Sequence, residues 1–99
     1  MTMVIGICRF TLRLPGSSSL KDKRRVIKSL TARLRNKFNV AVAEVADNET
    51  WQIATIGITC VSNDARHARE ILDSAIAFVE RTRLDAELLD SEIEVSQAF

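Results

Sequence analysis

Hydrophobic and polar residues alternate near the start of the chain. Residues 3–14 are rich in β-branched and apolar side chains and alternate in their second half, which predicts a strand. One face of this strand carries Val4, Cys8, Phe10, Leu12 and Leu14. The other face is apolar at one end and cationic at the other, with Ile5, Ile7, Arg9, Thr11 and Arg13. Pro15 and Gly16 then predict a turn.

Two later segments have the spacing of amphipathic helices. From residue 20 the apolar positions fall at 20, 27, 30, 34 and 38, which predicts a helix of about five turns. Residues 64–83 show a similar stripe after the cap residues Asn63 and Asp64. The polar surface of the first helix is strongly basic, because Lys21, Arg24, Arg25, Lys28 and Arg35 lie away from its apolar stripe.

Three further runs predict strands at residues 39–45, 51–62 and 86–95, with a turn at residues 46–50. In the middle run, Ala54, Ile56, Ile58 and Cys60 form the expected core face. The inward face of residues 39–45 stays open, because Val40 and Val42 are out of phase with Val45.

The predicted order of strands and helices is β-α-β-β-α-β. The simplest closure is an α+β, ferredoxin-like sandwich, with two helices on one face of a four-stranded antiparallel sheet. We expect one domain over residues 1–99, with residues 96–99 as a loose tail. In this topology the end of the first strand, the start of the first helix and the hairpin near Trp51 meet at one end of the sheet.

Charge is distributed unevenly, although the net charge is only +1. Residues 1–38 hold ten Lys and Arg against Asp22 alone, whereas residues 39–99 hold four Lys and Arg against twelve acids. This asymmetry favours either an anionic partner for the first half or mutual neutralisation of the two halves, within one chain or between subunits.

The start of the first helix is the candidate anion site. Free backbone N–H groups, hydroxyls and the positive end of the helix dipole could together bind a phosphate there. The phosphate-binding candidates are Ser17, Ser18, Ser19, Lys21, Lys23, Arg24, Arg25 and Lys28. The alternative is a solvated basic face whose serines only cap the helix, since Ser19 and Asp22 resemble a capping box.

Arg13 and Trp51 complete the candidate nucleic-acid site. Trp51 is expected on the sheet face away from the helices, where its ring could stack on an RNA base beside Arg13. Trp51 could instead anchor a dimer or pack over the hairpin. Arg9 and Arg13 could instead form cross-strand ion pairs with the acids at positions 92 and 94.

Catalytic, metal and cofactor signatures are missing from the sequence. The only cysteines, Cys8 and Cys60, lie in apolar strands and are expected as buried free thiols rather than as a disulfide. His67 has no neighbouring acid or nucleophile that would make it a base, and a P-loop is absent. We therefore expect a non-enzymatic, cytoplasmic protein with no cofactor, no small-molecule substrate and no membrane span.

The predicted outer face of the sheet also exposes apolar residues. Ile5, Ile7 and Ile53 share this face, and contiguous apolar patches are uncommon on soluble monomers. A homodimer is therefore expected.

Several blocks of the sequence resemble the YlxP-like family of small bacterial proteins of unknown function. They are "LRLPGSSSLKDKRRVIKSL", "RNKFNVAVAEV", "WQIATIGITCVSND" and "EIEV", and the resemblance covers about residues 3–95. It implies a ferredoxin-like fold, a cytoplasmic location and dimerisation. Genes of this family often stand beside those for translation initiation factor 2, the transcription factor NusA and ribosome-binding factor A, which implies a role near the ribosome.

Two functional hypotheses follow from the residues and the resemblance. The first is an accessory protein that binds RNA or the ribosome through phosphate contacts made by the first helix. The second is a homodimeric protein-interaction module with no nucleic-acid ligand.

Overall fold

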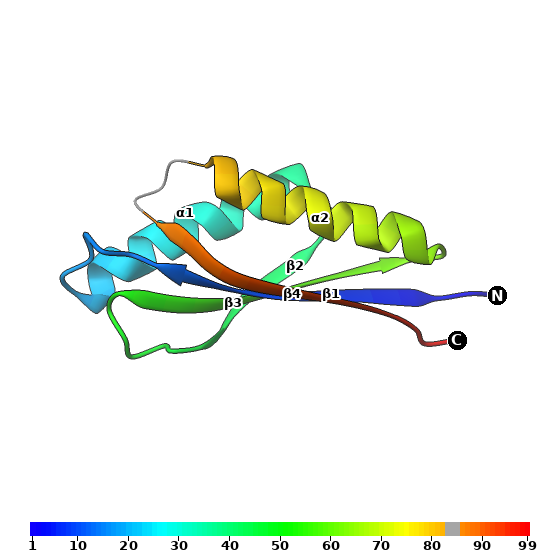
Figure 1. Cartoon of the computed structure of the whole chain (residues 1–99), viewed down its shortest axis with the longest axis horizontal. Coiled ribbons are helices and arrows are strands. Elements are labelled where there is room, and N and C mark those ends of the chain that lie inside the picture. The colour runs from blue at the N-terminus through cyan, green and yellow to red at the C-terminus, as the bar shows by residue number, and fades with distance from the viewer. Residues whose placement is uncertain (83–85) are drawn as a thin grey trace.

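The computed structural model describes residues 1–82 and 86–99, and its elements follow the order β1, α1, β2, β3, α2, β4 (Figure 1). The strands are β1 Val4–Arg13, β2 Ala41–Ala46, β3 Ile53–Ser62 and β4 Glu87–Gln97. The helices are α1 Leu20–Lys37 and α2 Ala65–Arg81. The predicted element order is confirmed, and the predicted end of the second helix at residue 83 lies outside the described residues.

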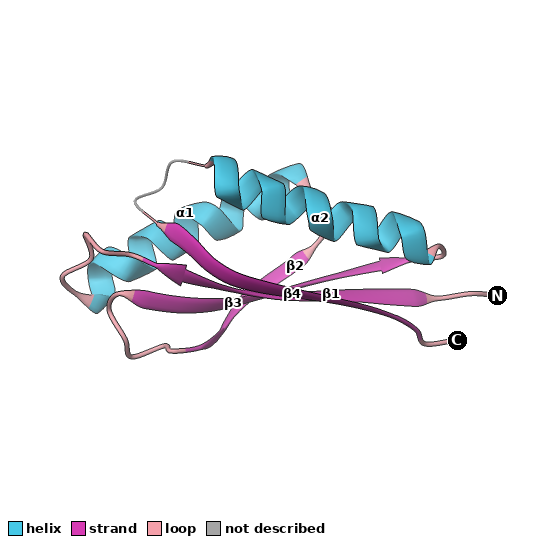
Figure 2. Ribbon diagram, viewed as in Figure 1, coloured by secondary structure: helices cyan, strands magenta, loops and turns pink. Residues whose placement is uncertain are grey.

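The four strands form one antiparallel sheet in the order β2-β3-β1-β4. Figure 2 shows both helices on the same side of this sheet. The fold is therefore α+β and ferredoxin-like, as the pattern of residues predicts. Burial alternates along β1 because successive side chains point to opposite faces, with the even-numbered residues turned toward the helices.

The hydrophobic core lies between the sheet and the two helices. Its largest fully buried apolar side chains are Phe10, Leu12, Leu14, Leu34, Ile56, Ile58 and Leu72. Gly6 lets α2 approach β1 closely, because a Cβ at this position would lie 2.9 Å from Cδ1 of Leu72. Cys8 and Cys60 are both buried and free, which confirms the expectation from their apolar surroundings.

Strand β2 contains a bulge that explains its ambiguous pattern. The register with β3 shifts between Glu44 and Ala46, so Val45 is the extra residue. Val45 lies over Gly57 on the side away from the helices, whereas Val42 is buried in the core. On the same edge strand, the Val42 carbonyl accepts a hydrogen bond of 2.8 Å from Nη2 of Arg35.

Two expected boundaries are wrong. Residues 51 and 52 precede β3 rather than starting it, so Trp51 lies in the hairpin loop and not on the sheet face. Residues 96–99 are not a loose tail, because β4 continues to Gln97 and the last residues bond to Met3. The Ala98 N–H donates to the Met3 carbonyl at 2.8 Å, and the Met3 N–H donates to the Phe99 carbonyl at 3.1 Å.

Candidate nucleic-acid interface

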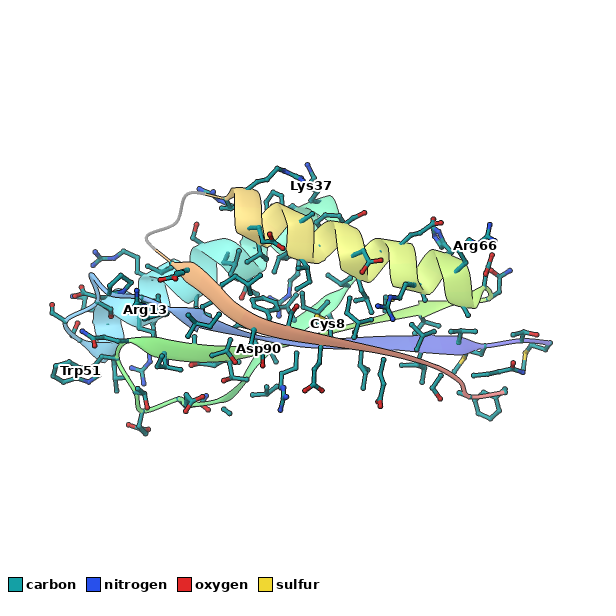
Figure 3. All side chains as sticks on the ribbon, in the orientation of Figure 1. Cys8, Arg13, Lys37, Trp51, Arg66 and Asp90 are labelled. Atoms are coloured by element: carbon teal, nitrogen blue, oxygen red, sulfur yellow. The ribbon has the colours of Figure 1, made fainter. Side chains whose placement is uncertain are left out.

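The turn before α1 and the β2–β3 hairpin meet at one end of the sheet. The Leu14 N–H donates to the Gln52 carbonyl at 2.8 Å, and Nε2 of Gln52 donates to the Ser17 carbonyl at 3.4 Å. Figure 3 places Arg13 and Trp51 toward this same end of the molecule. The predicted proximity of these three segments is confirmed.

The serines at the start of α1 bond to groups of the chain itself. Ser19 is the N-cap, and its hydroxyl accepts a hydrogen bond from the Asp22 N–H at 3.1 Å. The Ser18 hydroxyl donates to the Asp22 carboxylate at 2.8 Å, and the Ser18 N–H donates to the same oxygen at 3.2 Å. Ser17 is buried and donates to the Ser19 carbonyl at 3.1 Å.

Asp22 thus occupies the position where an outside phosphate was expected. The hydroxyl and then the N–H of Ser18 hold the pKa of the Asp22 carboxyl below its usual range, and the charge of Arg25 acts in the same direction. The expected cradle of three serines is therefore wrong as an open anion site. The alternative interpretation, in which these serines cap the helix, fits the observed hydrogen bonds.

Lys23, another of the phosphate-binding candidates, is buried against the hairpin. Only 1% of the residue is exposed, and its ammonium donates to the carbonyls of Asp47 and Thr50, the latter at 2.7 Å. Oε2 of Glu44 lies 2.7 Å from Nζ. This oxygen has no well-aligned hydrogen-bond partner among the described residues, so its contact with Lys23 is ionic. Lys23 fastens α1 to the hairpin and is not available for phosphate.

The arginines of β1 form ion pairs with β4. Nη2 of Arg9 lies 2.9 Å from Glu92, as the cross-strand interpretation predicts, and Nη2 of Arg13 lies 2.7 Å from Glu87. The partner of Arg13 is therefore Glu87 rather than the acid at position 94. All four side chains are more than half exposed, so each pair contributes about 0–1 kcal/mol and can be exchanged for other partners.

Four of the predicted cations remain exposed on α1. Lys21, Arg24, Arg25 and Lys28 stand at relative positions i, i+3, i+4 and i+7, which places them on one side of the helix. None of them forms an ion pair within residues 1–82 and 86–99. We refer to these four residues as the basic stripe. Farther along α1, Arg35 bonds to Val42 and Lys37 lies 5.2 Å from the centre of the Phe78 ring.

Trp51 stands at the end of the molecule where α1 begins. Its side chain projects from the hairpin loop in Figure 3, and 52% of the residue is exposed. A shallow hollow beside it is lined by Glu49, Thr50 and Gln52. This position leaves the ring accessible for stacking, although not on the sheet face where the sequence placed it.

Sequence reasoning expected exposed apolar residues on the face of the sheet away from the helices, but it missed the hollow in that face. Ile7, Val45, Gly57 and Thr59 border a shallow apolar hollow of about 320 Å³ there. The break in the alternation at Val45 was the available signal, but only the register with β3 shows which way this side chain points.

The buried thiol of Cys8 is poorly suited to catalysis. Burial, and secondarily the charge of Asp73, raises the pKa of the Cys8 thiol to about 11, which opposes its use as a nucleophile near neutral pH. No group of three or more His, Cys, Asp or Glu suited to a metal ion occurs in the part of the chain that the structure describes. Neither α1 nor α2 is long and apolar enough to cross a membrane, so the described residues contain no candidate spanning helix.

Comparison with known proteins finds a matching family and a relative in sequence. The family described as "Protein of unknown function (DUF503)" matches residues 5–93. The uncharacterized protein YlxP of Bacillus subtilis (strain 168) is 34% identical over 77 residues, which cover 78% of this chain and 84% of that protein. These matches confirm the resemblance found in the sequence blocks.

Solved structures share the fold at low sequence identity. The de novo designed protein Foldit4 aligns with a TM-score of 0.55 and 13% identity, over 95% of this chain and 96% of that one. A C-terminal segment of the alpha subunit of aIF2 from Pyrococcus abyssi aligns with a TM-score of 0.54 and 20% identity, over 91% of this chain and 51% of that chain. These similarities concern the fold alone.

Proposed function

The chain belongs to this family of proteins of unknown function, DUF503, and we propose that it is a non-enzymatic, RNA- or ribosome-associated accessory protein of the cytoplasm. The observation that carries the proposal is the basic stripe, whose four side chains are exposed and form no ion pair within the described residues. Phosphates of an RNA backbone supply the missing negative charge.

The position of the basic stripe supports an anionic partner. Lys21 lies in the first turn of α1, where the helix dipole disfavours a cation by about 0.3–1 kcal/mol, and Arg24 and Arg25 follow in the second turn, where this effect is weaker. Asp22 offsets part of this cost, and bound phosphates would offset the rest. The stripe spans eight residues, or about 10 Å of helix axis, so its long side chains can contact successive phosphates.

The chemistry of these side chains implies weak sequence specificity. Contacts to phosphates fix the position of a protein on a nucleic acid but do not distinguish bases. Trp51, at the same end of the molecule, adds stacking that every base can provide. We therefore expect a preference for single-stranded RNA segments with little dependence on their sequence.

The proposal predicts a steep loss of affinity with salt. If the basic stripe contacts about four phosphates, the logarithm of the association constant falls with the logarithm of salt at a slope of about −3, or roughly 50-fold between 50 and 200 mM. Fluorescence anisotropy of a labelled, unstructured RNA oligonucleotide measures this slope, and the fluorescence of Trp51 gives a second signal.

Charge-reversal variants distinguish RNA binding by the basic stripe from attraction of RNA to positive charge anywhere on the protein. The double variant Arg24→Glu/Arg25→Glu should weaken RNA binding at least tenfold and bring the salt slope to about −1.4, because two contacts are lost. Arg66→Glu/Arg69→Glu on α2 changes the net charge equally and should leave the slope near −3. An affinity independent of salt, or one that both double variants lower equally, would contradict the proposal.

A further inference from the structure

The face of the sheet away from the helices, which we call the open face, is apolar over β1, β2 and β3. Ile7, Val45 and Val61 on these strands are 46%, 56% and 62% exposed. Ile7 and Val45 border the hollow of about 320 Å³. Figure 2 shows α1 and α2 on the other side of the sheet. Contiguous apolar patches of this kind mark interaction surfaces on soluble proteins.

The β2–β3 hairpin loop closes one end of the open face. The Thr55 hydroxyl donates to the Asp47 carboxylate at 2.7 Å, and only 6% of Thr55 is exposed. The accessible apolar surface therefore lies farther along β3, at Gly57 and Thr59 and beside Ile7.

Acidic side chains occupy the β4 side of the same face. The outward residues of β4 include four acids: Glu87, Asp90, Glu92 and Glu94. Arg9 and Arg13 of β1 pair with two of them. The other two, Asp90 and Glu94, are exposed and form no ion pair within residues 1–82 and 86–99. Because β2, β3 and β4 contain no Lys or Arg, the open face is negative overall.

The apolar and acidic parts of the open face meet at Ile7. In the sheet, Ile7 lies between Thr59 on β3 and Glu94 on β4. A smaller hollow of about 170 Å³ between β1 and β4 is bordered by Arg9, Glu92 and Glu94. Neighbouring strands are about 4.8 Å apart, so the apolar hollow over β3 and the acids of β4 are roughly 10 Å apart. One short segment of a partner can contact both.

These charges favour a basic partner over the other possible occupants. A second copy placed on this face would bring two sets of unpaired carboxylates, from Asp90 and Glu94 of each chain, into one interface. The phosphates of RNA would meet the same carboxylates. A segment with Lys or Arg instead supplies the missing positive charge.

We propose that a basic, amphipathic segment of another protein docks on the open face. A large apolar side chain of this segment fills the hollow beside Val45 and Gly57, and a Lys or Arg pairs with Glu94 or Asp90. Helix residues seven positions apart lie on one side at about 10 Å, which matches the spacing of the two parts. The basic stripe lies on α1, in the opposite layer, so this proposal does not depend on RNA binding.

Selection of random peptides displayed on phage, with the wild-type protein as bait, tests the chemistry of the partner. Peptides of about 12 residues suffice, because they span about 18 Å as a helix. The enriched peptides should carry a net positive charge and at least one large apolar residue. Addition of a selected synthetic peptide should shift the backbone amide NMR signals of Ile7, Gly57 and Glu94, and leave those of Lys21 and Arg24 in place.

Matched variants then test the two parts of the face by fluorescence anisotropy of the labelled peptide. Glu94→Lys should weaken binding at least tenfold, because it places a cation against the cation of the peptide. Glu70→Lys makes the same change at an exposed position of α2 and should not. Ala43→Phe should also weaken binding at least tenfold by filling the hollow, whereas Ala32→Phe at an exposed position of α1 should not. Circular dichroism checks that each variant is folded.

Several results would overturn the proposal. One is a selection that enriches no peptide, or enriches acidic or uncharged ones. Another is a set of NMR shifts that maps to α1 or α2, or a peptide affinity that neither Glu94→Lys nor Ala43→Phe lowers more than its control does. A wild-type chain that sediments at twice its mass of 11.1 kDa, as a dimer that excludes the peptide, would assign the face to a second copy instead.

Discussion

Asp22 shows how one side chain can change the interpretation of a surface. In the sequence it is the single acid among the cations of residues 1–38, and its spacing from Ser19 predicts a capping box. The structure confirms the cap and adds two hydrogen bonds from Ser18 to its carboxylate. The negative charge at the positive end of the α1 dipole therefore comes from the protein itself.

The depressed pKa of Asp22 gives a testable dependence of stability on pH. Because the folded pKa lies below the ordinary value of 3.8, ionised Asp22 stabilises the fold above that value, and this contribution is lost as the pH falls through the folded pKa. Asp22→Asn should therefore lose less stability between about pH 5 and pH 2 than the wild-type chain does. Urea unfolding at a series of pH values measures the difference.

Ser18→Ala checks the physical cause of this pKa shift. The Ser18 hydroxyl is its largest cause, so the variant should bring the Asp22 pKa closer to its ordinary value in a carboxyl NMR titration. An Asp22 pKa that does not move would assign the shift to other groups.

At the scale of elements, Lys23 and Glu44 connect α1 to the β2–β3 hairpin. The sequence could not predict this contact. Lys23 stands among four other polar residues, and its burial depends on a hairpin that begins about twenty residues later. The direction of Glu44 follows from the pairing of β2 with β3, which the alternation of residues 39–45 left open. The spacing of residues along the chain predicts the presence of a helix or strand more reliably than it predicts which of its polar side chains are buried.

Removing Lys23 should therefore destabilise the protein strongly. Lys23→Met leaves Glu44 and the carbonyls of Asp47 and Thr50 without their cation, and we expect a loss of about 3 kcal/mol in the free energy of unfolding. Lys28→Met removes an exposed cation of α1 and should change stability by about 0.5 kcal/mol or less. Denaturant unfolding compares the two variants.

A second substitution separates the ion pair from simple packing. Lys23→Met/Glu44→Leu should recover part of the loss, because it removes the uncompensated carboxylate. If Lys23→Met costs no more than Lys28→Met, or if the double variant shows no coupling, the contact does not hold the hairpin as described.

At the scale of the whole molecule, the order of the elements and the sheet topology follow directly from the sequence. Hydrophobic residues recur every two positions in a strand and every 3.6 positions in a helix, so the sequence reveals each element locally. Because the six elements are joined by short connections, only a few sheet topologies are possible. Part of the candidate site does not follow in this way. Contacts with other groups of the chain engage Ser17 and Lys23, whereas Lys21 and Arg24 are exposed and stay candidates for phosphate binding.

The rate at which Cys8 and Cys60 react with a thiol reagent measures how often the whole fold opens. Cys8 and Cys60 are buried beneath the helices, and the Cys8 pKa of about 11 keeps that thiol protonated at pH 8. We expect both to react with Ellman's reagent at least ~10³-fold more slowly in the native protein than in guanidinium, because labelling requires unfolding. Ala32→Cys should label promptly as a control. A native thiol that reacts as fast as this control would show that the core opens locally.

The hydrogen bond from Arg35 to the Val42 carbonyl has a consequence beyond the single chain. An edge strand with vacant backbone groups can recruit another strand and extend without limit into fibres. On β2 a guanidinium from the same chain occupies one of those backbone acceptors, and the bulge at Val45 interrupts the regular spacing of the others. Edge-to-edge addition of a further strand is thereby obstructed at β2, which protects the protein against open-ended association at high concentration.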